Sequence, residues 1–311
     1  MSDLKAFRVD GGRVVEMAGS SVALERELQS LVEANMEAML GVRFLASEYE
    51  TGRHRGRIDS LGLDETGAPV IVEYKRTRDK EVVTQALSYL AWLNDSQSEF
   101  EGLVREQLGA EAAGSVDWSR PRIVCVAGDF TPHTVVALEM IRHRIDLVAY
   151  RMFEDVVTLR LVASFTAPSG ASVVFRSRTA GAASPTQEAR ASGGGKTVQE
   201  YLDGAPQGLK DLFADLDAVL MESGSVQRET LQHYVAYRRI KNVASVKVQP
   251  RKRTLVVGLK LDPDSVELVE GFTRDVRGIG FLGTGDLEVR IRSRADLERA
   301  GELIRRSVEA G

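Results

Sequence analysis

Two acidic residues and one lysine are spaced so that they could form a single catalytic site. The segment that carries them is GRIDSLGLDETGAPVIVEYKRT, and the residues are Asp59, Glu73 and Lys75. Side chains alternate along a strand, so Glu73 and Lys75 share one face, and Asp59 comes beside Glu73 if two strands pair as a hairpin. The apolar run before Glu73 predicts a central, buried strand, where charged side chains have a desolvation cost unless they coordinate something. The pattern therefore predicts a functional site.

These residue types suit the metal-assisted hydrolysis of a phosphodiester. The carboxylates of Asp59 and Glu73 supply the hard oxygen ligands that Mg²⁺ or Mn²⁺ would take. Such a metal lowers the pKa of a bound water and stabilises the charge that develops on the phosphate. Lys75 can orient the attacking water or stabilise the pentacovalent state. We therefore expect a nuclease that uses Mg²⁺ or Mn²⁺ as its cofactor.

The order of these residues resembles the PD-(D/E)XK nuclease superfamily. Asp59 is followed by thirteen residues and then by the pattern Glu73-x-Lys75. One departure is that Ile58, rather than a proline, precedes the aspartate. The resemblance implies a restriction-endonuclease-like fold and catalytic roles for the three matching residues, of which Asp59 and Glu73 bind the metal.

Two further matches narrow the resemblance. Gln85 and Tyr89 form a Q-x-x-x-Y pattern on the following helix, as in the RecB-like branch, and the two fall on one helical face. Residues 20–160 as a whole look like the mismatch-directed endonucleases of the NucS type. In that family a helix glutamate joins the metal site; here Glu25 matches it best, and Glu27 and Glu33 remain alternatives.

Arginines stand on both sides of the predicted site and are expected to contact the phosphates of nucleic acid. These candidates are Arg53, Arg55, Arg57, Arg76 and Arg78. The resemblance implies that the nucleic acid is DNA and that the protein is an endonuclease. Because related nucleases often cut both strands as dimers, the resemblance also implies a homodimer.

Less specific interpretations of the same residues remain open. Asp59, Glu73 and Lys75 could be alternating charges on a surface hairpin, and Gln85 and Tyr89 could border the apolar face of an ordinary core helix. The alternative function is a nuclease-like fold that binds nucleic acid or a protein partner without hydrolysis. Cleavage by the wild-type protein that is lost when one of these residues is substituted would indicate an enzyme rather than this binding protein.

Hydrophobic periodicity predicts the elements that position this site. They are a β-hairpin over 7–17, helices over 23–40, 81–95 and 131–144, and strands over 43–49, 57–64, 68–75, 122–129, 145–153 and 156–164. The first helix has an apolar face that includes Leu28, Val32 and Met36, and Gly41 is expected to end it. The fold class is therefore α/β, with a mixed sheet flanked by helices.

The stretch 166–196 is rich in Ala, Ser and Gly and predicts a flexible linker between a nuclease-like domain over 1–165 and a second domain over 197–311. Its segment SVVFR could add a late strand to the first domain. The second domain is expected to be a smaller α+β domain, with helices over 197–206, 209–222 and 294–310, two strands within 244–261 and a further strand over 287–293. Its segment VRGIGFLGTGDLEVRIRS resembles a C-terminal domain of unknown function that follows such nuclease domains, and some of those proteins are labelled predicted transport proteins.

Composition fits this interpretation. The chain has 311 residues, one cysteine (Cys125), no apolar run long enough for a membrane helix and no secretory signal at its N-terminus, so we expect a cytoplasmic protein without a membrane partner. The net charge of −4 argues weakly against a nucleic-acid partner. However, residues 1–165 contain 26 acidic and 19 basic residues, and some of these acids are the predicted metal ligands.

Overall fold

The computed structural model describes residues 4–20, 25–52, 56–75, 82–141, 143–165, 196–279 and 285–311. The chain divides into two compact units, Met1–Pro168 and Ser169–Gly311. The predicted linker and its segment SVVFR fall almost entirely outside the described residues. No helix in the described ranges is long and apolar enough to cross a membrane. All the predicted catalytic residues belong to the first unit.

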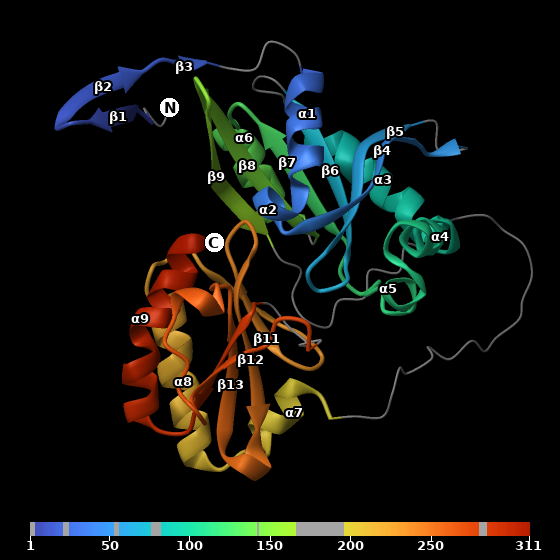
Figure 1. Ribbon diagram of the computed structural model, residues 1–311. Helices are drawn as coiled ribbons and strands as arrows, with labels where there is room; N and C mark the ends of the chain where they lie inside the picture. The colour runs from blue at the N-terminus through green and yellow to red at the C-terminus, as the bar shows by residue number, and fades with distance from the viewer. Residues whose placement is uncertain are drawn as a thin grey trace, which may run out of the picture. The chain divides into compact units, whose positions relative to one another are not determined.

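The first unit is built on a seven-stranded mixed sheet with the order β3-β8-β7-β6-β5-β4, and β9 pairs with β8 (Figure 1). Strands β6, β7 and β8 run parallel, whereas β5 is antiparallel to β6. The central strands consist mainly of buried β-branched and other apolar residues, as expected for strands covered on both faces. The strands are β3 (Gly19–Ser20), β4 (Val42–Glu50), β5 (Arg57–Asp64), β6 (Pro69–Lys75), β7 (Arg122–Ala127), β8 (Arg144–Phe153) and β9 (Val156–Phe165).

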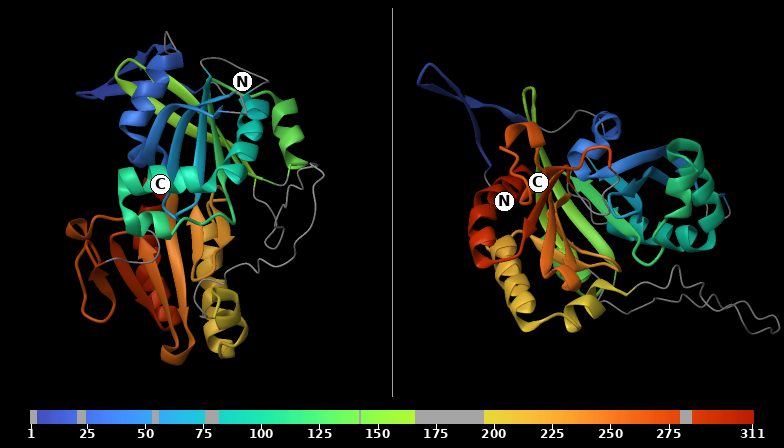
Figure 2. Two further views of the ribbon diagram at one scale, coloured as in Figure 1. Left: turned by 90° about the vertical axis from the view of Figure 1, so that its right-hand side faces the viewer. Right: turned by 60° about the horizontal axis from the view of Figure 1, so that its bottom comes forward.

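Helices cover both faces of this sheet, as the views in Figures 1 and 2 show. Helices α1 and α2 lie over one face, and α1 contacts β5 and β6. Helices α3 and α6 lie over the other face, where their apolar residues join one core cluster with Ile71 and Ile123. The helices are α1 (Glu25–Ala34), α2 (Met36–Leu40), α3 (Val82–Asp95), α4 (Gln97–Leu108), α5 (Ala110–Gly114) and α6 (Pro132–Glu139). The predicted mixed α/β class is confirmed.

Three details differ from the sequence-based prediction. The first helix is interrupted at Asn35, where the backbone leaves the helical region (φ −133°, ψ 23°), so α1 and α2 are separate helices. Gly41 ends α2 in the left-handed conformation, as predicted (φ 66°). Helices α4 and α5 were not predicted, because α4 is polar at most positions with only Phe100 and Val104 buried, and α5 has only five residues. The helix predicted over 131–144 ends at Glu139, and strand β8 begins at Arg144.

The N-terminal hairpin is present as predicted. Strands β1 (Ala6–Asp10) and β2 (Arg13–Met17) pair antiparallel across the Gly11–Gly12 turn, in a two-stranded sheet of their own. Both turn glycines have positive φ (53° and 81°), which suits a tight hairpin. Arg8 joins the hairpin to the β8–β9 turn through ion pairs with Glu154 (2.8 Å) and Asp155 (3.3 Å).

A buried charge network closes the end of the sheet at which β6 begins. Asp64 accepts a hydrogen bond from Arg144 Nη1 (2.7 Å), and Arg122 Nε donates to Asp146 (2.7 Å). Burial alone would raise the pKa of Asp64, but Arg144 and Arg122 hold it below its ordinary value. Thr66 and the backbone of the β5–β6 turn donate to the other carboxylate oxygen. The network fixes the hairpin that carries Asp59 and Glu73.

We expect Asp64→Asn to lower the free energy of unfolding of the first unit by about 3–5 kcal/mol, because it removes the charged acceptor that the buried Arg144 binds at 2.7 Å. Since the pKa of Asp64 is lower in the folded protein than in the unfolded chain, its stabilisation is present above about pH 4 and is lost as the pH falls further. Urea unfolding at neutral and acidic pH measures both effects. The control Asp10→Asn, at an exposed position, should behave as wild type; an Asp64→Asn protein of wild-type stability would contradict the assignment.

The second unit is an α+β domain with one antiparallel sheet of order β10-β11-β12-β13-β15-β14. Its strands are β10 (Gln227–Thr230), β11 (Val235–Arg238), β12 (Asn242–Gln249), β13 (Thr254–Leu259), β14 (Thr273–Asp275) and β15 (Leu287–Ile291). Its helices are α7 (Val198–Asp203), α8 (Gln207–Met221) and α9 (Arg294–Ala310), with the short 3₁₀ turns η2 (Pro250–Lys252) and η3 (Pro263–Ser265). Strands β10, β11 and β14 were not predicted; the α+β class was.

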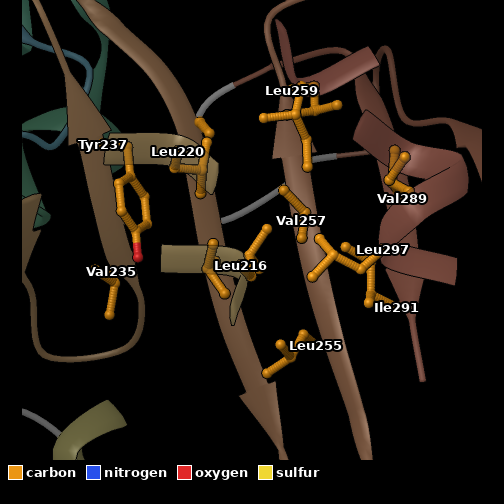
Figure 3. Packing of buried hydrophobic residues seen from close by; sticks show 14 of the residues in the cluster. Leu216, Leu220, Val235, Tyr237, Leu255, Val257, Leu259, Val289, Ile291 and Leu297 are labelled. Atoms are coloured by element: carbon orange, nitrogen blue, oxygen red, sulfur yellow. The ribbon is translucent and has the colours of Figure 1, made fainter. Parts of the chain in front are cut away.

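The core of the second unit lies between the sheet and helices α8 and α9. Leu216 and Leu220 of α8 and Leu297 of α9 pack with alternate residues of β13 and β15, such as Val257 and Val289 (Figure 3). The period-two pattern of the strands thus buries one face of the sheet against the helices.

A capping box formed by Thr197 and Glu200 begins α7.

Candidate metal centre

The candidate site lies where β5 and β6 separate. The pairing of the two strands stops at Ser60 opposite Val72, one residue before Asp59 and Glu73. Beyond this point the side-chain carboxylates, rather than backbone oxygens of the neighbouring strand, accept the backbone N–H groups. Glu73 Oε1 accepts the N–H of Asp59 (3.2 Å), and Asp59 Oδ2 accepts the N–H of Tyr74 (3.0 Å). Each acid is therefore held by the strand of the other, which places both at the carboxyl end of β6.

Burial makes this pair of carboxylates electrostatically costly. Only 2% of the surface of Glu73 is exposed. Burial, followed by the charge of Asp59, raises the pKa of Glu73 to about 8. Burial also raises the pKa of Asp59, against the lowering effects of the Tyr74 N–H and of Lys75. The two carboxylates therefore repel each other when both are ionised, and a bound cation would offset this repulsion.

Lys75 is a cation whose charge acts on both members of the pair. It follows Glu73 by two residues on β6, and its Nζ donates to Glu25 Oε1 (3.1 Å). Burial alone would lower the pKa of Lys75, but the contact with Glu25 and the charges of Asp59 and Glu73 together raise it. Lys75 is thus a protonated ammonium at neutral pH, suited to stabilising negative charge rather than to accepting a proton.

Helix α1 presents three polar residues to this region, one turn apart. Glu25 holds Lys75, Gln29 Nε2 donates to the backbone oxygen of Asp59 (2.9 Å), and Glu33 Oε1 accepts from Ser60 Oγ (2.6 Å). The sequence left Glu25, Glu27 and Glu33 as alternatives for a third metal ligand. Glu25 contacts Lys75 of the site, Glu33 contacts the hydroxyl of Ser60 on β5, and Glu27 is exposed. Gln29 was not predicted as a site residue. Its position four residues after Glu25 places it on the same face of the helix, which could have indicated this contact.

Tyr89 of α3 positions the start of β5. Its hydroxyl donates to the backbone oxygen of Arg57 (2.8 Å), and the nearby charge of Glu73 adds to the effect of burial in raising its pKa. Gly56 leaves room for the ring, since a Cβ at this position would lie 2.4 Å from Tyr89 Cε1. Tyr89 therefore acts on the site through strand β5. Gln85, one turn earlier on α3, has an exposed side chain.

We expect Tyr89→Phe to lower the free energy of unfolding by about 1 kcal/mol, the net value of one hydrogen bond. Gly56→Ala is expected to cost about 1–3 kcal/mol, because the added methyl group displaces the Tyr89 ring. Thermal unfolding of both variants measures these losses. Tyr201→Phe, at a more exposed tyrosine of α7, serves as the control; equal stability of all four proteins would contradict this role of Tyr89.

The predicted arginine contacts are only partly described. Arg57 is exposed at the start of β5 and forms an ion pair with Glu48 (2.8 Å). Arg53, Arg55, Arg76 and Arg78 lie outside the described residues. Their contacts with DNA therefore stay predictions.

The donor set fits a divalent cation that is bound by few protein ligands. Two adjacent carboxylates with raised pKa values favour a cation beside them, and Mg²⁺ is commonly held by one or two carboxylates together with water and substrate phosphate. In the ranges that the structure describes, no three His, Cys, Asp or Glu side chains converge as a preformed metal cage. Asp59 and Glu73 would therefore be the protein ligands, and a direct role for Glu25 stays a prediction.

Comparison with known proteins assigns no activity to the chain. Residues 198–310 match a family described as a domain of unknown function (DUF5655), which agrees with the predicted C-terminal domain. An uncharacterized protein of Haemophilus influenzae is 26% identical over 313 residues, which cover 98% of this chain and 100% of that protein.

Two solved structures show partial similarity to the chain. The EndoMS–dsDNA2 complex is 24% identical, with 42% of this chain and 47% of that chain covered and a TM-score of 0.27. A repair endonuclease from Pyrococcus abyssi is 22% identical, with 41% and 48% covered and a TM-score of 0.26. The chain thus spans about half the length of these proteins, and the assignment to the NucS or RecB-like branch stays a prediction. The function has to be argued from the geometry of the site.

Proposed function

We propose that this protein is an endonuclease that hydrolyses phosphodiester bonds of DNA with the help of Mg²⁺ or Mn²⁺. The observation that carries the proposal is the interlocked pair of Asp59 and Glu73, buried at the end of β6 with the ammonium of Lys75 beside it. A structural ion pair would need one acid for one base. Here two adjacent acids lie beside one lysine, whose ammonium donates to a third acid, Glu25.

Each residue has a defined task in this proposal. Asp59 and Glu73 would hold the cation, which, when bound, polarises the phosphate and lowers the pKa of a bound water. Lys75, protonated and held by Glu25, would donate to a phosphate oxygen as negative charge develops there. Tyr89 donates to the backbone oxygen of Arg57 and Gln29 to that of Asp59, which fixes β5 and keeps the two carboxylates in register.

Cleavage of DNA in the presence of Mg²⁺, Mn²⁺ or EDTA tests the proposal. We expect the wild-type protein to cleave only with a metal, and Lys75→Gln to lower the rate at saturating DNA by about 10²–10³-fold, as for the loss of one transition-state donor. Lys252→Gln, at an exposed lysine of the second unit, is the control. Single-stranded DNA and RNA should be included in the panel. Binding of DNA without cleavage under any metal would instead support the non-cleaving alternative.

The homodimer that the resemblance implies is also a proposal, and light scattering of the full chain at several concentrations tests it.

A further inference from the structure

A small open hollow lies on the same face of the first unit's sheet as Lys75. It is lined mainly by Gly128 and Asp129, directly after β7, by Ala149 and Arg151 of β8, and by Thr158 and Arg160 of β9. Neither arginine belongs to the sequence-predicted site. The hollow therefore brings together two basic side chains from strands that the catalytic motif does not include.

The strand register connects this hollow to the candidate metal centre. Lys75 pairs with Ala127, Ala127 with Ala149, and Ala149 with Arg160, so all four lie in one row across the sheet. Residues paired in this way project from the same face. Three strand spacings of about 4.8 Å separate Lys75 from Arg160, or about 14 Å. The residues between them are Ala127, which is buried in the core beneath α3 and α6, and Ala149, which lines the hollow.

The two arginines form a positive pair without an acidic partner in the described part of the chain. Arg151 lies opposite Thr158, and Arg160 is two residues further along β9, so they are diagonal neighbours on one face. Like charges at such diagonal positions, about 7–8 Å apart, repel each other weakly in water. Both side chains are exposed, whereas many other arginines of the chain form ion pairs, such as Arg8, Arg57 and Arg120. A bound anion would relieve the repulsion.

The remaining lining residues are Leu4, Gly128, Asp129, Ala149 and Thr158. Asp129 Oδ1 accepts the N–H of Phe130 (2.9 Å), which ties this carboxylate to its own loop. Gly128 and Ala149 add no bulk, and Thr158 contributes a hydroxyl that contacts the backbone oxygen of Arg151 (3.4 Å). Helix α6 begins three residues after Asp129, and its N-terminus adds positive potential. With two guanidinium groups against one carboxylate, the hollow has a net positive charge.

We propose that this hollow, through Arg151 and Arg160, binds a backbone phosphate of the same nucleic-acid strand that is cut at Asp59 and Glu73. This inference rests on the proposed function and deepens it. One strand of B-form DNA advances about 3.4 Å per phosphate along the axis, so about 14 Å corresponds to a few nucleotides. The arginines would thus set the position of the DNA strand relative to Lys75 without reading the DNA sequence.

Salt-dependent DNA binding tests this role. The full-length chain carries Asp59→Asn so that the DNA stays intact, and its affinity for a labelled duplex is measured by fluorescence anisotropy at increasing salt. We expect Arg151→Gln/Arg160→Gln to weaken binding by about tenfold and to reduce the slope of log affinity against log salt by about 1, the value for one lost phosphate contact. Arg105→Gln, an exposed arginine of α4, is the matched control and should leave the slope unchanged.

The outcomes separate this inference from the proposed function. If the double variant matches the control in affinity and slope, the inference is wrong, even if the wild-type protein cleaves DNA with Mn²⁺. If the slope falls as expected but the wild-type protein cleaves nothing, the phosphate site stands and the proposed hydrolysis fails. Inorganic phosphate is the second probe: if it stabilises the wild type against melting but not the double variant, while both bind DNA equally, the hollow binds a free anion and the inference is again wrong.

Discussion

Asp59→Asn is expected to lower the rate of metal-dependent DNA cleavage by about 10³-fold or more. The substitution keeps the size of the side chain and an oxygen that can accept the Tyr74 N–H, which Asp59 Oδ2 binds at 3.0 Å. It removes the negative charge that would hold the cation. Loss of metal-assisted stabilisation is worth several kcal/mol, and each 1.36 kcal/mol is about tenfold in rate.

The rate is measured at saturating DNA and metal, with Asp10→Asn as the control for the same chemical change at an exposed position of the hairpin. Circular dichroism confirms that both variants are folded. If Asp59→Asn cleaves as fast as Asp10→Asn, then Asp59 is not a metal ligand and the pair at the end of β6 is structural.

Mn²⁺ is expected to raise the melting temperature of the wild-type protein, and Glu73→Gln is expected to abolish this increase. A ligand that binds only the folded state stabilises it by about 2.7 kcal/mol at a hundred times its dissociation constant. Because the pKa of Glu73 is raised to about 8 without metal, its side chain carries a proton at neutral pH, and glutamine imitates that neutral form. The variant is therefore expected to melt at or above the wild-type temperature in EDTA.

Glu106→Gln, at an exposed position of α4, is the matched control and should keep the full response to Mn²⁺. The response of the wild type should grow from pH 6 to pH 8, since a proton and the metal compete for Glu73. A wild-type response retained in Glu73→Gln would show that the metal binds elsewhere. This measurement needs no cleavable substrate, so it tests the metal centre independently of the proposed endonuclease activity.

The sequence alone determined the centre of the candidate site. The alternation of side chains placed Glu73 and Lys75 on one face, and the short turn after Asp64 made an antiparallel pairing of β5 and β6 the natural arrangement. Both features are local: they depend on residues within one hairpin. The order of strands and helices that gives the mixed α/β class was predictable for the same reason, since each element has its own hydrophobic period.

Contacts between distant segments were decided only by the tertiary structure. Three glutamates on one helix look alike in sequence, and the packing of α1 against β5 and β6 selects Glu25 as the partner of Lys75. The break at Asn35 and the polar helix α4 likewise depend on packing rather than on a periodic pattern. Arg151 and Arg160 come into one row with Lys75 through three successive strand pairings. Such pairings are set by the burial of whole sheet faces, which no single segment of the sequence encodes.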